Sequence, residues 1–79
     1  MDIEVETFLR ERNRVMRELD IAGGKRILNR PDADDETVLV ALHKARIMWR
    51  GASDLEVAVS TAWLKERGYS APERGPFVG

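Results

Sequence analysis

The sequence predicts a small all-α domain of three to four helices without a sheet. Apolar residues recur at three- and four-residue spacing through most of the chain, as they do in amphipathic helices. Ser53 and Glu56 have the S-x-x-E spacing of a capping box, which marks a helix start. Gly51 and Gly68 stand where helices commonly end in a left-handed turn. These signals predict a helical hairpin over residues 34–67, onto which the earlier part of the chain packs.

The first helix is predicted over residues 3–19. Its apolar positions keep helical spacing, while arginines and glutamates fill the opposite face. The apolar positions are Val5, Phe8, Leu9, Val15, Met16 and Leu19. Arg12 interrupts this stripe, so its charge either extends past the edge of the core or meets a carboxylate of another chain.

A weak second helix is predicted over residues 21–28. Asp20 is a suitable N-cap, but Gly23 and Gly24 each cost about 1 kcal/mol relative to alanine inside a helix. Pro31 then breaks the pattern, and a cluster of acidic residues follows that favours the start of the next helix.

The hairpin helices are predicted over residues 34–50 and 54–67. The apolar stripe of the first is Val38, Ala41, Leu42, Ala45, Met48 and Trp49. That of the second is Leu55, Ala58, Val59, Ala62 and Trp63. We expect Trp49 and Trp63 to pack against each other in the core. The domain then ends near Gly68, and residues 69–79 are predicted to be a tail because their prolines and glycines follow no period.

Four apolar residues lie off these stripes and suggest a second interface. They are Val40, Ile47, Val57 and Leu64. The core of so short a chain supplies only roughly 3–5 kcal/mol, and the sequence has no cysteine to add a disulfide. We therefore predict a homodimer that forms through these four residues.

Basic residues gather between positions 10 and 30 although the net charge is only −1. They are Arg10, Arg14, Arg17, Lys25, Arg26 and Arg30. Two interpretations stay open. The cluster is either a contact surface for an acidic protein or for phosphates, or a solvated face neutralised by acids such as Glu11 and Glu18. A helix-turn-helix interpretation of the hairpin is disfavoured because Asp54 and Glu56 would repel phosphates at the end that approaches DNA.

No catalytic or cofactor signature stands out. His43 is the only histidine, and we expect it to be a surface or half-buried structural residue, with Asp35 and Glu36 as the only nearby acids for general acid–base chemistry. The tripeptide Gly23–Lys25 lacks the spacing of a phosphate-binding loop. We predict that the protein is not an enzyme and binds no cofactor.

The acidic run at residues 32–36 also fails as a metal site. A calcium loop would need glycine at Thr37 and glutamate near Lys44. We predict no metal site. The N-terminus lacks a signal-peptide pattern and no apolar run is long enough to span a bilayer, so we expect a soluble cytoplasmic protein without membrane contact.

Three motifs carry a resemblance to a known group of proteins: A-L-H-K-A-R at residues 41–46, the joint at residues 50–53 and W-L-x-x-R-G at residues 63–68. In this arrangement the chain resembles small uncharacterised helical accessory proteins of tailed bacteriophages and prophages. The resemblance carries over no functional residues. It implies a non-catalytic binder that modulates a host protein in the cytoplasm of a bacterial host. The alternative is a small DNA-binding transcriptional regulator that uses the first helix and residues 25–30.

Overall fold

The computed structural model describes residues 3–73, and within this range it contains four α-helices and no strand. The helices are α1 (Ile3–Glu18), α2 (Ile21–Leu28), α3 (Asp35–Met48) and α4 (Asp54–Glu66). The predicted all-α fold class is confirmed, and each predicted helix is found within two residues of its expected bounds.

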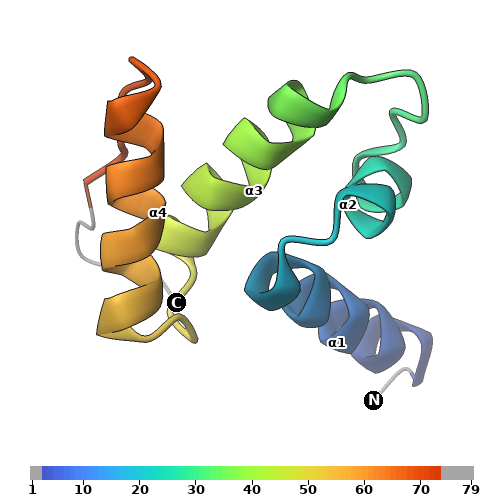
Figure 1. Cartoon of the computed structure of the whole chain (residues 1–79). Helices are drawn as coiled ribbons and strands as arrows, with labels where there is room; N and C mark the ends of the chain where they lie inside the picture. The colour runs from blue at the N-terminus through green and yellow to red at the C-terminus, as the bar shows by residue number, and fades with distance from the viewer. Residues whose placement is uncertain (1–2, 74–79) are drawn as a thin grey trace.

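Helix α3 is the centre of the fold (Figure 1). The corner formed by α1 and α2 packs on one side of α3, and α4 lies on its other side. The molecule measures 39 × 33 × 18 Å, so its shortest dimension is less than two helix diameters of about 10–12 Å. A body this thin leaves the outer helix faces close to solvent. Within residues 3–73, none of the helices combines the length and apolar character that crossing a bilayer requires.

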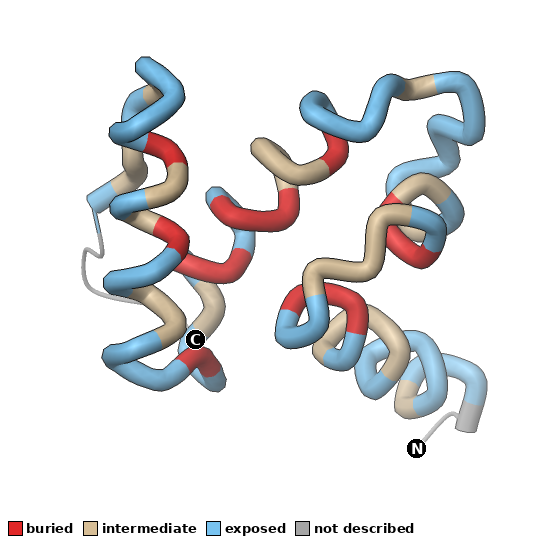
Figure 2. The backbone as a smooth tube through the Cα atoms, in the orientation of Figure 1, coloured by how far each residue is buried: buried red, intermediate tan, exposed pale blue. Residues whose placement is uncertain are grey.

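Buried residues lie along α3 and on parts of α1, α2 and α4 (Figure 2), and they form two layers that meet at α3. The first lies between α1, α2 and α3 and consists of Val15, Met16, Val38 and Leu42, with Trp49 packed against it. The second lies between α3 and α4 and consists of His43, Ile47, Ser60 and Leu64. Because α3 supplies both layers, its apolar residues occupy two sides of the helix.

The glycine pair of α2 is explained by close packing. A Cβ atom on Gly23 would lie 2.6 Å from Cγ2 of Val15, and one on Gly24 would lie 2.8 Å from Cγ1 of Val38. Both valines are buried. The Asp20 side chain accepts a hydrogen bond from the Gly23 backbone N–H at 3.1 Å, which confirms the predicted cap. The pair therefore weakens the isolated helix but lets α2 approach its two neighbours.

Gly68 ends α4 as expected, with φ at +81°. The Tyr69 N–H donates to the Leu64 carbonyl at 2.9 Å, the six-residue bond of a Schellman motif. Leu19 and Asn29 take the same left-handed conformation after α1 and α2 without being glycine.

The prediction for Gly51 was wrong. α3 ends at Met48, Trp49 is extended with φ at −81°, and Gly51 has no positive φ. A Cβ atom there would lie 2.6 Å from the Trp49 indole, so the glycine allows the backbone to contact the ring closely. The capping box is confirmed: Ser53 Oγ accepts from the Glu56 N–H at 3.1 Å, and Glu56 Oε1 accepts from the Ser53 N–H at 2.8 Å.

The predicted core stripe of α4 was also wrong. Leu55 is 73% exposed and Val59 is 50% exposed, and Ala58 and Ala62 are exposed beside them. The opposite side of the helix, with Ser60 and Leu64, faces α3 instead. Both sides of α4 are apolar, and the inward side is the one whose serine reaches His43.

The predicted tail begins as part of the fold. Tyr69 stacks over Trp63 with ring centroids 6.5 Å apart. Its hydroxyl donates to the Glu36 carboxylate, and this hydrogen bond raises the pKa of Tyr69. The end of α4 is thus tied to the start of α3. Residues 74–79 of the predicted tail lie outside the described residues.

Candidate functional site

A buried histidine–serine pair joins α3 to α4. Nδ1 of His43 lies 2.9 Å from Oγ of Ser60, and the two residues are 1% and 0% exposed. The Trp63 ring stacks on the imidazole at 4.3 Å, and Arg46 lies near Ser60. Burial, and then the positive charges of Arg46 and Arg67, lower the pKa of His43 to about 4. His43 is therefore neutral near pH 7 and lies deeper than the surface or half-buried position expected for it.

The pair has the spacing of a base and a nucleophile but not their access. Its shared hydrogen bond uses Nδ1, and Trp63 covers one face of the ring. A substrate would reach neither side chain unless α4 separated from α3. We interpret His43 and Ser60 as a structural contact that orients α4.

Glu56 connects three helices. Its Oε2 accepts hydrogen bonds from Arg46 Nη2 at 3.2 Å and from Arg17 Nε at 3.3 Å, while its Oε1 caps α4 at Ser53. The backbone hydrogen bond from Ser53, followed by the bond from Arg46, lowers the pKa of Glu56 to about 2. Glu56 thus stays charged in the folded protein over most of the pH range and links α1, α3 and α4 near the turn that joins α3 to α4.

Arg46 is the buried cation of this network. Only 8% of the residue is exposed, and Nη2 also donates to the Arg17 carbonyl at 3.2 Å. Its Nε is buried and has no hydrogen-bond partner in the part of the chain that the structure describes. Neither Arg46 nor Ser60 was expected inside the fold. A recognisable signal would have been the i, i+3 spacing of His43 and Arg46, which places two polar side chains on one side of a central helix.

The two tryptophans do not form the predicted pair. Trp63 stacks on His43, whereas Trp49 packs against the first core layer and faces Arg17, whose guanidinium lies 4.8 Å from the ring centroid. Arg17 Nη2 also donates to the Gly51 carbonyl at 3.0 Å. The tryptophans lie on opposite sides of α3 because α3 has a layer on each side.

Most of the predicted basic surface is neutralised within the chain. Arg14 pairs with Glu11 at 2.6 Å, Glu18 at 3.5 Å and Asp20 at 3.1 Å. Hydrogen bonding from Arg14 lowers the pKa of Glu11.

The other predicted cations follow the same trend. Arg26 pairs with Glu11 at 3.2 Å, and Lys25 pairs with Asp35 at 3.1 Å. Only Arg10 and Arg30, among the six, form no ion pair within the described residues. The solvated, self-paired interpretation fits this geometry better than a surface for phosphates or an acidic partner.

The predicted self-association surface does not form as expected. Ile47 and Leu64 are 1% and 0% exposed and belong to the layer between α3 and α4. Val40 and Val57 are half-buried. Ile47 and Leu64 are therefore core residues of one chain, and they are not available to a second copy.

Two other apolar surfaces are exposed. The first is the outer face of α4, defined by Leu55, Ala58, Val59 and Ala62. The second, which we call the α1 stripe, is Val5, Phe8 and Leu9. The sequence identified both sets as apolar stripes but assigned them to the core, since spacing alone does not say which stripe a neighbour covers.

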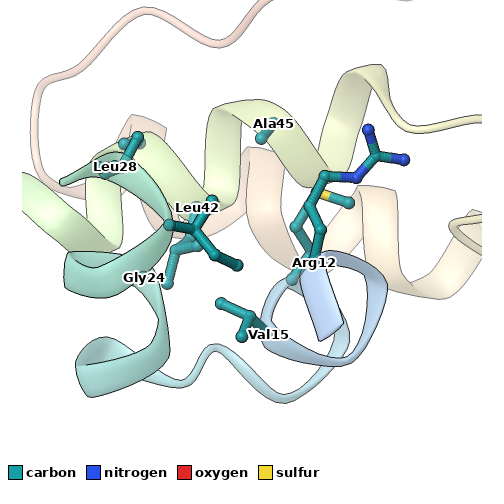
Figure 3. Close-up of a pocket in the computed structure, with 9 residues that line it drawn as sticks. Arg12, Val15, Gly24, Leu28, Leu42 and Ala45 are labelled. Atoms are coloured by element: carbon teal, nitrogen blue, oxygen red, sulfur yellow. The ribbon is translucent and has the colours of Figure 1, made fainter. Parts of the chain in front are cut away.

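An apolar pocket of about 210 Å³ lies between α1, α2 and α3 (Figure 3). Val15 and Leu42 form its inner wall, and Leu28 and Ala45 stand at its sides. The aliphatic part of Arg12 borders the opening, and its guanidinium extends away from Leu28. Nothing in the described part of the chain gathers three or more histidine or acidic side chains in an arrangement that would hold a metal ion.

Comparison with known proteins gives no relative: no family model, no curated protein and no solved structure matches this chain.

Proposed function

We propose that this protein is a non-catalytic binding module that docks the outer face of α4 against another protein. The observation that carries the proposal is the exposure of Leu55, Ala58, Val59 and Ala62 on a helix whose opposite side is already buried. A helix with apolar residues on two opposite sides is normally covered on both of them.

The shape of this face suits a helix or groove of the partner. Leu55 and Val59 project one turn apart, and Ala58 and Ala62 beside them leave a flat strip on which another backbone can approach closely. Recognition through i, i+3, i+4 and i+7 positions is the usual mode of helix-in-groove binding.

The charges at the ends of the strip favour a different protein over a second copy. Asp54 stands at the beginning of α4 and Glu66 continues the strip at its end. Two α4 strips laid antiparallel would bring Asp54 of one copy towards Glu66 of the other, so self-pairing places like charges together. The complementary partner carries an apolar groove with cationic groups at its ends.

The phage-like resemblance makes a bacterial host protein the partner to look for. Such a partner is consistent with a chain whose buried histidine and serine have no access to substrate and whose basic residues are largely paired with acids. The resemblance itself is an association with a genomic setting and supplies no contact residue.

The experiment is capture from bacterial lysate with the full chain as bait, read by quantitative mass spectrometry. Val59→Glu places a charge in the strip, and Ala22→Glu is the control because Ala22 is an exposed apolar residue on another helix. The proposal predicts a protein that is captured by wild type and Ala22→Glu and lost with Val59→Glu. Capture that survives Val59→Glu, or no specific capture, would contradict it.

A further inference from the structure

The α1 stripe and the neighbouring pocket have complementary shapes within one molecule. Phe8 is 50% exposed on the stripe, and the pocket opens one helical turn further along, at Arg12. An apolar cavity of about 150 Å³ in another protein holds a benzene molecule. The pocket of about 210 Å³ therefore has room for a phenyl ring.

We propose that two copies of this chain pair through antiparallel α1 helices, with Phe8 of each copy seated in the pocket of the other. This interface is independent of the α4 face proposed above. Because the same surface is used by both copies, the contact is isologous and closes at a dimer.

The helical register supports this arrangement. Phe8 and Arg12 lie four residues apart and so share one face of α1. If a two-fold axis crosses α1 near Arg10, each Phe8 lies opposite Arg12 of the second copy, which is the border of the pocket. Val5 then faces the end of α1 that contains Val15, a residue of the pocket wall.

One charge on the contact side of α1 favours the antiparallel orientation. Glu4 and Glu6 lie in the first turn, and Arg12 is the later arginine on the side of the helix that carries Phe8. An antiparallel pair brings the acidic first turn of one copy towards Arg12 of the other, whereas a parallel pair aligns like charges.

Arg12 has an unmet hydrogen-bonding need at this position. Within residues 3–73 its Nε is buried without a partner, and its Nη2 donates only to the side chain of the adjacent Asn13, at 3.2 Å. A first-turn carboxylate of the second copy would supply an acceptor next to the pocket.

The apolar area is of the size that a small dimer requires. Val5, Phe8 and Leu9 of the stripe and Leu28 of the pocket lining are 39–51% exposed, and Met48 on α3 is 43% exposed about one turn beyond the pocket residue Ala45. Half-exposed side chains of this size offer together roughly 400 Å². A standard interface contributes about 800 Å² per partner, of which a little over half is apolar, so roughly 450 Å² is needed.

Sedimentation equilibrium of the full chain, over concentrations up to about 1 mM, tests the proposal. Wild type is expected to be a reversible dimer. Phe8→Glu should weaken association by about 30-fold or more, the effect of losing a hot-spot anchor. Ala45→Leu should weaken it as well, by filling the side of the pocket. Val59→Glu is the matched control, since its residue is as exposed as Phe8 but lies on α4, and it should leave the dimer intact.

Circular dichroism verifies that each variant is folded. We expect Phe8→Glu to fold because Phe8 is half exposed in the single chain. Nuclear Overhauser contacts in a mixed-isotope sample locate the ring directly: the proposal predicts intermolecular contacts from Phe8 to the Leu42 and Leu28 methyls. A wild-type monomer throughout the concentration range would overturn the proposal. So would a dimer unaffected by Phe8→Glu, or one without those contacts. Because Val59 and Phe8 lie on different surfaces, this result and the fate of the α4 proposal are independent.

Discussion

Nδ1 of His43 lies 2.9 Å from Oγ of Ser60, and this contact determines which side of α4 faces inward. Both sides of α4 carry apolar residues, so the burial of apolar surface alone does not decide which side packs against α3. Turning the outer face inward would exchange one set of aliphatic side chains for another and would leave a buried imidazole without its partner, at a cost of about 1–3 kcal/mol. The polar pair thereby leaves the Leu55–Ala62 face in solvent, where it is available for binding.

Removing the serine hydroxyl should destabilise the fold. Ser60→Ala leaves His43 Nδ1 buried without a partner, and we expect a loss of about 1–3 kcal/mol in the free energy of unfolding measured with urea. Thr61→Ala is the control at the next, half-buried position of α4, and it should change stability by less than about 0.5 kcal/mol. Equal losses of unfolding free energy in the two variants would mean that the His43–Ser60 hydrogen bond adds no specific stability.

Stability should fall with acid in a window set by His43. The pKa of His43 is lowered to about 4 in the folded protein from an ordinary value of 6.5, so the unfolded chain binds more protons between these values. The contribution of His43 is fully present above pH 6.5 and is lost as the pH falls towards 4, with a slope of at most about 1.4 kcal/mol per pH unit.

Urea unfolding between pH 4.5 and pH 7 measures this slope. In His43→Gln the slope in that window should flatten, whatever the absolute stability of the variant. An unchanged slope would mean that His43 titrates normally in the folded protein. Glu56 acts in a lower window, because its pKa is lowered from 4.5 to about 2 and its contribution is lost only as the pH falls through that range.

Gly24→Ala should destabilise the protein although alanine is the better helix former. Helix propensity alone predicts a gain of about 1 kcal/mol, but the added methyl would lie 2.8 Å from Cγ1 of the buried Val38. Overpacking of a core typically costs about 1–3 kcal/mol, so we expect a net loss measured by chemical unfolding. Ala22→Gly, at an exposed position of the same helix, reports propensity alone and should cost about 1 kcal/mol. A stabilised Gly24→Ala would show that α2 packs more loosely than described.

Glu56→Gln should lower the melting temperature several times more than Glu18→Gln. The first substitution removes the carboxylate charge that pairs with both Arg46 and Arg17 and so links α1, α3 and α4. The second removes an exposed partner of Arg14, which keeps two other carboxylates. Thermal unfolding followed by circular dichroism compares the two. Similar melting temperatures would indicate that Glu56 acts as a surface charge.

The helices were predictable because their signals are local. Spacing of apolar residues, the Asp20 cap, the Ser53–Glu56 box and Gly68 each depend on residues within one or two turns. The orientation of α4 was not predictable in this way. It depends on a contact between His43 and Ser60, which are seventeen residues apart, and no periodic pattern marks such a pair.

The sequence indicated an apolar and a basic binding surface, but the residues chosen for them are largely buried or paired in the structure. Ile47 and Leu64 looked peripheral because they lie off the dominant stripes, yet α3 has a layer on each side and both residues are buried. The basic residues looked available because their acidic partners are distant in sequence, as with Lys25 and Asp35. Which stripe stays uncovered, and which charge stays unpaired, is decided by packing between helices.

The most direct test is the reactivity of single cysteines, which the cysteine-free sequence makes simple. In Val59→Cys the thiol stands on the outer face of α4, and in Ser60→Cys it stands one residue further, on the side that faces α3. The structure predicts that the first reacts with a thiol reagent close to the rate of an unfolded peptide, and that the second is strongly protected until the protein unfolds. Protection at position 59 with free reaction at position 60 would mean that α4 packs by the opposite face.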